Sequence, residues 1–220
     1  MKIDMHVHSR YSEDGSAEIE EIIRAAKRKG LDGIAITDHN TIDGWDEAIR
    51  LGKKYGIIVV RGEEVSSKEG HILAYGISHK IEKGMSADET VKEIKQAGGV
   101  AVAAHPFRVS NGVGGNVVRR VNFDDIEVIN SWSPPYINRK AEKLAKSLGL
   151  PVTGGSDAHR TDDIGRAYTV FPDDVKSEYD VIKSMKQGRV SAGGSSQEWG
   201  ALLSESYKKL IRWVKRGRRI

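Results

Sequence analysis

Short runs of apolar residues alternate with helical patterns along most of this 220-residue chain. Runs such as those at 33–37, 57–60 and 100–104 have the length and the β-branched content of strands. Between such runs apolar residues return every three or four positions, as Ile19, Ile22 and Ile23 do. The alternation predicts βα units and a mostly parallel sheet. At this length, with 38% hydrophobic residues, we expect one α/β domain.

Composition excludes several classes of protein. The chain contains no cysteine, which rules out disulfides and thiolate metal ligands. It has no run of 18 apolar residues, so we expect no membrane span. The first residues lack the apolar stretch of a signal peptide, and a cytoplasmic location is therefore expected.

The positive charge of the chain is concentrated near its C-terminus. Between Lys208 and Arg219 there are seven Lys or Arg and no acidic residue, which leaves 28 basic and 31 acidic residues elsewhere. We expect a catalytic-type domain over 1–195, followed over 196–220 by a C-terminal helix with a basic tail. Such a tail can attract nucleic acid. A solvated helix end is the simpler explanation of the same charges.

Histidines stand where the predicted strands end. Six of the seven lie at the end of an apolar run or just past it. In a barrel of parallel strands the C-terminal strand ends share one rim, where active sites assemble. We therefore expect a metal cluster at that rim, formed with nearby carboxylates by His6, His8, His39, His71, His105 and His159.

The spacing of these residues supports shared metal ligation. Strand side chains at positions i and i+2 point to the same face. His6 and His8 can therefore direct two imidazoles at one ion, and Asp157 and His159 can direct a carboxylate and an imidazole inward together. One such pair is weak evidence, but several at successive strand ends are strong evidence.

The motifs resemble those of the PHP domain, the polymerase and histidinol phosphatase superfamily. The resemblance extends from residue 1 to about 192. It implies a distorted TIM-like barrel of about seven βα units in a single domain. The motifs that carry it are Met5 to Ser9, Asp14 with Gly15, Ile36 to Asn40, Gly62 to Ser66, His71 to Leu73, Ala104 to Pro106, and Gly155 to His159.

The resemblance also implies three groups of metal ligands. The first ion would be held by His6, His8, Glu64 and Asp157. Glu64 would bridge to a second ion, completed by His71 and His105. The third would be held by Asp14, His39 and His159.

Two of these assignments have an adjacent competitor. Glu13 stands beside Asp14, and Glu63 beside Glu64. In the family the ligand is followed by an aliphatic residue and then Ser, which matches Glu64, Val65 and Ser66.

Such a site is suited to the hydrolysis of phosphate esters. A bridging carboxylate holds two divalent ions about 3.5–4 Å apart, and a metal-bridging hydroxide between them is the nucleophile. His39 or His159 could protonate the leaving group instead of binding metal. Imidazole and carboxylate ligands suit two to three ions of zinc, manganese or iron.

The expected substrate is a phosphorylated small molecule, a nucleotide or a short RNA or DNA end. Arg108 follows His105 by three residues and Arg166 follows His159 by seven, so both are candidates to bind its phosphate.

Two other functions fit parts of the pattern. A PHP-like barrel that had lost its metals could serve as a nucleic-acid-binding or complex-forming subunit, but the ligand set is complete here. A metal hydrolase that cleaves C–N bonds would use a bridging modified Lys or a Glu, and no Lys stands clearly at a motif strand end. The oligomeric state is left open by the sequence.

Overall fold

The structure, a computed structural model, describes residues 1–196 of the chain. The predicted C-terminal helix and its basic tail lie outside the described residues, apart from residue 196. The strands are β1 (Lys2–Val7), β2 (Gly33–Ile36), β3 (Ile58–Ser66), β4 (His71–Tyr75), β5 (Val100–Ala103), β6 (Asp125–Asn130), β7 (Val152–Gly155), β8 (Ala167–Val170) and β9 (Ser191–Gly194). The helices are α1 (Ile19–Arg28), α2 (Trp45–Tyr55), α3 (Ala87–Gln96), α4 (Gly115–Arg120), α5 (Pro135–Leu148) and α6 (Glu178–Lys186). None of these helices is long and apolar enough to cross a membrane.

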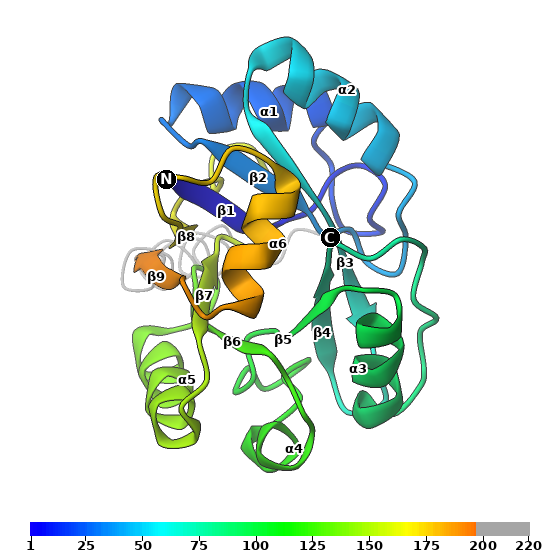
Figure 1. The fold of residues 1–220 in the computed structure, drawn as a ribbon, viewed down its shortest axis with the longest axis vertical. Coiled ribbons are helices and arrows are strands. Elements are labelled where there is room, and N and C mark those ends of the chain that lie inside the picture. The colour runs from blue at the N-terminus through cyan, green and yellow to red at the C-terminus, as the bar shows by residue number, and fades with distance from the viewer. Residues whose placement is uncertain (197–220) are drawn as a thin grey trace, which may run out of the picture.

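The strands of the described chain form one curved sheet in the order β7-β6-β5-β4-β3-β2-β1-β8-β9. The sheet nearly closes on itself, because Val7 at the end of β1 forms a parallel bridge with Ala158 after β7. The amide of His8 donates to the carbonyl oxygen of Ala158 at 2.9 Å. In Figure 1, α1 and α2 lie together at one end of the molecule, and α4 and α5 lie at the other. The predicted class, a distorted TIM-like barrel in a single domain, is confirmed.

The expectation of a mostly parallel sheet was wrong for half of the strand pairs. β3 pairs antiparallel with β4, β4 with β5, β1 with β8, and β8 with β9. The reason at β3 is the connection: only residues 67–70 join it to β4, which is too short for the crossover that a parallel pair needs. β3 also continues to Ser66 rather than ending near Val60, so it carries Glu63 and Glu64 within the sheet.

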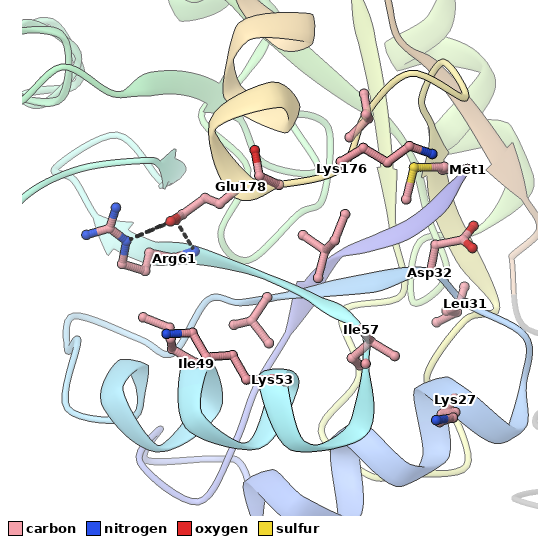
Figure 2. Close-up of a pocket in the computed structure, with 16 residues that line it drawn as sticks. Met1, Lys27, Leu31, Asp32, Ile49, Lys53, Ile57, Arg61, Lys176 and Glu178 are labelled. Atoms are coloured by element: carbon pink, nitrogen blue, oxygen red, sulfur yellow. Dashed lines mark hydrogen bonds and ion pairs between the residues drawn. The ribbon is translucent and has the colours of Figure 1, made fainter.

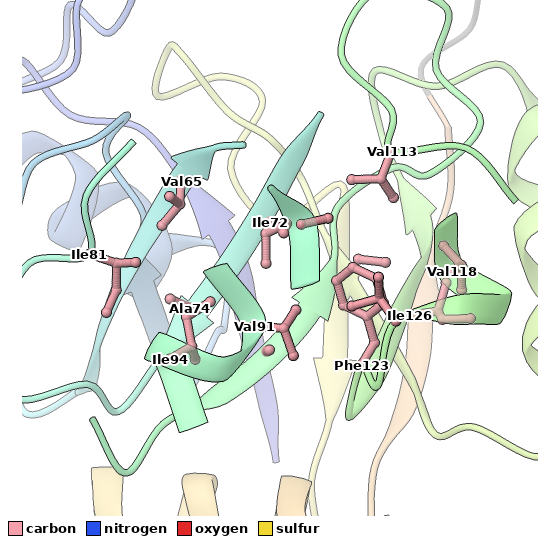
Figure 3. Close-up of a cluster of buried hydrophobic side chains, with 14 of the residues drawn as sticks. Val65, Ile72, Ala74, Ile81, Val91, Ile94, Val113, Val118, Phe123 and Ile126 are labelled. Carbon is pink, nitrogen blue, oxygen red and sulfur yellow. The ribbon is translucent and has the colours of Figure 1, made fainter. Parts of the chain in front are cut away.

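The core is built in layers on the two faces of the sheet. Met5, Leu73 and Tyr75 pack together inside the barrel. The opposite sheet face packs against helices, and Figure 3 shows the part of this cluster in which Ile72 and Val91 lie. The apolar spacing of the helices supplies these contacts, because residues three or four apart share one helix face.

One buried carboxyl group in the sheet has no compensating partner. Asp125 in β6 is fully buried, and neither of its carboxylate oxygens has a hydrogen-bond partner among the described residues. Burial, with a smaller contribution from the charge of Asp124, raises the pKa of Asp125 to about 7. A buried unpaired carboxylate disfavours the folded state once it is ionised.

We therefore expect Asp125→Asn to stabilise the protein at neutral pH but not in acid. The unfolded Asp125 loses its proton near its ordinary pKa of 3.8, and the folded one only near 7. The wild type thus loses stability as pH rises through this window, by up to about 4 kcal/mol at about 1.4 kcal/mol per pKa unit. Denaturant unfolding of both proteins at pH 4 to 8 measures the difference. A variant that gains equally at every pH, or loses stability at pH 8, would contradict the assignment.

Candidate metal centre

The first strand directs two histidines into the barrel. His6 and His8 are fully buried, and their Nε2 atoms lie 3.1 Å apart. Val7, between them, packs on the other side with the residues of α1 and α2. The register of β1 against β2 shifts between Asp4 and Val7. The predicted i, i+2 arrangement of the two imidazoles is what the structure shows.

Glu64 in β3 lies at the centre of the cluster. Its Oε1 is 2.9 Å from His71 Nδ1 and 3.0 Å from His105 Nε2. Its Oε2 is 3.0 Å from His6 Nε2 and 3.2 Å from His8 Nε2. One buried carboxylate therefore contacts histidines that come from three different strands or strand ends.

Glu63 points to the opposite face of β3. Its Oε2 accepts a hydrogen bond from the amide of Ile81 at 2.8 Å, and burial raises its pKa to about 7. Of the two adjacent glutamates, Glu64 is the one that the fold brings into the cluster.

Asp157 and His159 lie past the end of β7, rather than within a strand as the i, i+2 interpretation assumed. Asp157 has φ 55°, and Ala158 forms the bridge to Val7. The turn nevertheless brings both side chains to the cluster: Asp157 Oδ1 lies 3.2 Å from His8 Nε2, and His159 stacks on the His8 ring with centroids 4.5 Å apart.

Asp14 joins two histidines at the outer side of the cluster. Its Oδ2 is 2.9 Å from His159 Nε2 and 3.4 Å from His39 Nε2. The hydroxyl of Ser12 donates to Asp14 Oδ1 at 2.8 Å. Glu13 is exposed and belongs to none of the groups of clustered ligand atoms found in the described residues, so the geometry favours Asp14.

Three groups of side chains bring their ligand atoms within 4.8 Å of one another. The first coincides with the set that the family resemblance implies for the first ion. The second contains Glu64 and His71 with His39. His105 lies outside this group, although its Nε2 is 3.0 Å from the same Glu64 Oε1 that His71 contacts. The groups are His6, His8, Glu64 and Asp157; His39, Glu64 and His71; and His8, Asp14, His39 and His159.

The charges and lone pairs of the cluster fit a set of cations. Burial opposes the ionisation of Glu64 and Asp157, but the adjacent histidines, with Arg108 beside Asp157, hold the pKa of both carboxyl groups well below their usual range. Burial lowers the pKa of His8, but Asp157 and Glu64 outweigh it and raise that pKa to about 9. Two imidazole nitrogens at 3.1 Å repel each other unless a cation or proton lies between them. A divalent ion would accept the lone pairs of both imidazoles and would also compensate the negative charges of Glu64 and Asp157.

A layer of buried polar groups holds the ligands in place. Glu127 in β6 accepts from His6 Nδ1 at 2.9 Å and from the amide of His105 at 2.9 Å. Asn130 donates to Asp157 at 3.2 Å and to Glu127 at 3.1 Å. Such partners fix ring orientation and raise ligand basicity. Glu127 was not predicted as a site residue, although an acidic residue inside the apolar run 125–130 is a signal for it.

The backbone is strained where the ligands are presented. The described chain has three non-glycine residues with positive φ: Asn40, which follows His39, and the cluster residues His105 and Asp157. Strained residues of this kind gather at functional sites, where the surrounding structure holds them.

The two arginines that were expected to bind phosphate have different surroundings. Arg108 reaches the cluster, with its Nη1 2.8 Å from Asp157 Oδ2. Arg166 forms its ion pair with Asp163 instead, at 3.0 Å, in a loop that Lys29 at the end of α1 holds through the carbonyl oxygens of Asp162 and Ile164.

A separate hollow lies at the opposite ends of the strands. Its lining includes Met1, Asp32 and Ile58, which precede or begin β1, β2 and β3. Arg61 and Glu178 form an ion pair at 3.0 Å in its wall, as Figure 2 shows. None of the cluster residues lines it. The N-terminal strand ends of such barrels contribute stability rather than chemistry.

The nearly closed barrel with a buried imidazole and carboxylate cluster at one rim defines a class of metal-dependent hydrolases. The chain belongs to the PHP family: the model described as the PHP domain matches residues 4–130, and the one described as PHP-associated matches residues 135–190. The family membership that the motifs predicted is confirmed.

Known relatives extend this finding. A protein of Methanocaldococcus jannaschii that has no assigned function is 37% identical over 160 residues, which cover 67% of this chain and 94% of that protein. A two-domain protein from Bacteroides vulgatus, containing a predicted PHP-like metal-dependent phosphoesterase, has the same fold with a TM-score of 0.74, 21% identity, and coverage of 89% of this chain and 65% of that one. A lesion-specific endonuclease from Pyrococcus furiosus has a TM-score of 0.68 and 18% identity, over 87% of this chain and 57% of that one.

The two adjacent glutamates provide a matched pair of variants. We expect Glu64→Gln to lower the number of bound metal ions and to reduce activity by more than the roughly 10- to 100-fold that loss of an outer partner costs. Glu63→Gln should keep both, because a neutral side chain already suits that buried position and its amide oxygen still accepts from Ile81. Elemental analysis after metal loading gives the stoichiometry. Equal losses in the two variants would show that the assignment of Glu64 is wrong.

Proposed function

We propose that this protein hydrolyses phosphate esters with a cluster of two to three divalent metal ions, Zn, Mn or Fe. The observation that carries the proposal is the buried carboxylate of Glu64, which lies within 3.4 Å of five histidine rings, with Asp157 and Asp14 in the neighbouring groups of ligand atoms. The substrate classes that suit it are a phosphomonoester, a nucleotide, or a short RNA or DNA end.

The proposed ligands follow the three groups of the cluster. Those of the first ion are His6, His8, Glu64 and Asp157, and those of the second are Glu64, His71 and His105, with His39 close by. Those of the third are Asp14, His39 and His159. When bound, such ions neutralise phosphate oxygens and lower the pKa of water.

The chain itself supplies positioning and proton transfer. Glu127 holds the ring of His6 in one orientation, and the carbonyl oxygen of Asp157 lies 2.9 Å from Nδ1 of His159 and orients that ring. His39 and His159 are the most accessible histidines of the cluster, with 17% and 26% of their side chains exposed. Whichever of the two does not bind metal can instead donate a proton to the leaving oxygen of a substrate that approaches from the solvent side.

Arg108 is placed to bind the substrate's phosphate. Its guanidinium already lies against Asp157, and its side chain is about one-quarter exposed. Guanidinium groups bind phosphate through two parallel N–H bonds, which orients as well as attracts it. The basic segment 208–219 remains a proposed contact for nucleic acid, on its charge alone.

The direct test is metal-dependent activity on a defined set of substrates. Purified protein is stripped of metal, reloaded with Mn²⁺, Zn²⁺ or Fe²⁺, and assayed with phosphomonoesters, nucleotides and 5′-phosphorylated oligonucleotides. We expect hydrolysis that a chelator abolishes and that one of the metals restores. A protein that binds two or more ions and yet hydrolyses none of these esters would overturn the proposal and favour the complex-forming subunit.

The two arginines also form a matched pair of variants. Arg108→Ala should lower kcat/KM about 10- to 100-fold, because a hydrogen bond to a charged group contributes roughly 1.5–3 kcal/mol. Arg166→Ala should leave it nearly unchanged, since that guanidinium pairs with Asp163. Metal content is measured in both, so that loss of ions is separated from loss of phosphate binding. A larger loss of kcat/KM in Arg166→Ala than in Arg108→Ala would show that Arg166 is the residue that binds the phosphate.

A further inference from the structure

A basic groove lies between α4, α5 and the loop that follows β5. Its lining includes the cations Arg119, Lys140 and Lys143 and no acidic side chain. None of these three cations has a carboxylate within ion-pair distance in residues 1–196. Over the same residues the chain has 28 basic and 29 acidic groups, so the positive charge of the groove is a local excess and does not reflect the net charge of the described chain.

The groove is continuous with the metal centre through the loop of residues 105–114. Phe107 lies in its wall, one residue before Arg108. The amide of Arg108 donates to the carbonyl oxygen of His105, and the amide of His71 donates to that of Asn111. The same loop therefore holds two histidines of the cluster on one side and forms the groove on the other.

The exposed face of α5 extends this path toward the cluster. Tyr136, Lys140, Lys143 and Ser147 recur at helical spacing and share one face, over about 16 Å at 1.5 Å per residue. Tyr136 is 63% exposed in the first turn of the helix. Trp132, just before the helix, lies with its ring centroid 6.3 Å from that of His159.

Proteins bind single-stranded nucleic acid with aromatic rings and rows of cations, and this surface has both: the rings lie near the metal centre and the cations beyond them. Bases stack on aromatic rings, and the backbone phosphates pair with Lys and Arg. Lys140 keeps its ammonium 4.3 Å from the centroid of the Phe107 ring, which fixes one of these charges at the groove wall.

We propose that this groove binds the backbone of a single-stranded oligonucleotide whose scissile phosphate lies at the metal centre. The proposal rests on the proposed function and narrows its substrate class. Trp132 and Tyr136 contact the bases nearest the scissile phosphate, and Lys140, Lys143 and Arg119 contact the phosphates beyond them. The chain's own basic segment 208–219 is excluded as the occupant, because it carries the same sign of charge as the groove.

Affinity should therefore increase with the length of the strand. Binding of fluorescently labelled dT2, dT4 and dT8, and of the corresponding oligouridylates, is measured by anisotropy with metal-stripped protein. We expect affinity to rise at least tenfold from two to eight nucleotides, and the salt slope of the longest strand to include about 0.7 for each phosphate contacted.

Charge reversal tests the location of the site. Lys140→Glu with Lys143→Glu should abolish the dependence on length. The matched control reverses Arg24 and Arg28, two exposed cations one turn apart on α1, at the other end of the molecule. Hydrolysis of bis(p-nitrophenyl) phosphate by the metal-loaded proteins should be the same in the wild type, the groove variant and the α1 control. Equal rates also show that the variants are folded.

The outcomes separate this proposal from the preceding one. Three results would each contradict oligonucleotide binding in the groove. They are an affinity that does not depend on strand length, an equal effect of the α1 control, and equally tight binding of an eight-base-pair duplex. Absence of hydrolysis of every phosphomonoester, nucleotide, oligonucleotide and phosphodiester tested, under every metal, would instead overturn the proposed function. The anisotropy series would still show whether the groove binds single strands.

Discussion

The buried carboxylate of Glu64 is the group on which the arrangement of the rim depends. A carboxylate that is only 1% exposed pays a large desolvation penalty unless opposite charge surrounds it. Here the positive charge of His6 and hydrogen bonds with His71 and His105, from the ends of β1, β4 and β5, stabilise the ionised carboxylate. The contacts hold together strands from both halves of the sheet. The rim therefore gathers imidazoles and carboxylates that depend on one another for their charge and orientation, and together they suit a set of cations.

The course of β3 explains how one strand can serve both the core and the site. Its first half pairs in parallel with β2, and its second half pairs antiparallel with β4. Along the second half, Val65 packs under the helices while Glu64 faces the barrel interior. Below the cluster that interior is filled by apolar side chains such as Leu73 and Tyr75. The polar site is thus a cap on a packed core, and its ligands lie at or near the strand ends that meet at one rim.

Patterns of local origin could be predicted from the sequence, whereas contacts made by the folded chain could not. The alternation of side chains in a strand is local, and it placed His6 and His8 together correctly. The turn after β7 is not local: Asp157 reaches the cluster through a positive φ and a bridge to β1. The partners of Arg108 and Arg166 likewise depend on which way two loops fold back. The antiparallel β3 and β4 pair was missed because the run was taken to end before Glu63.

The side chains of the cluster are buried at one side and partly exposed to solvent at the other. This difference determines the direction from which a substrate can reach the cluster. His6, His8, Glu64 and Asp157 are buried, but Asp14 has 45% of its side chain exposed and His159 26%. The innermost groups are held by the buried Glu127 and Asn130, and the barrel interior beneath them is packed with apolar side chains. Access is therefore from the side of Asp14 and His159. Trp132 and Arg108 stand on that same side, so a phosphate entering there meets a cation and an aromatic ring before it meets the innermost ligands.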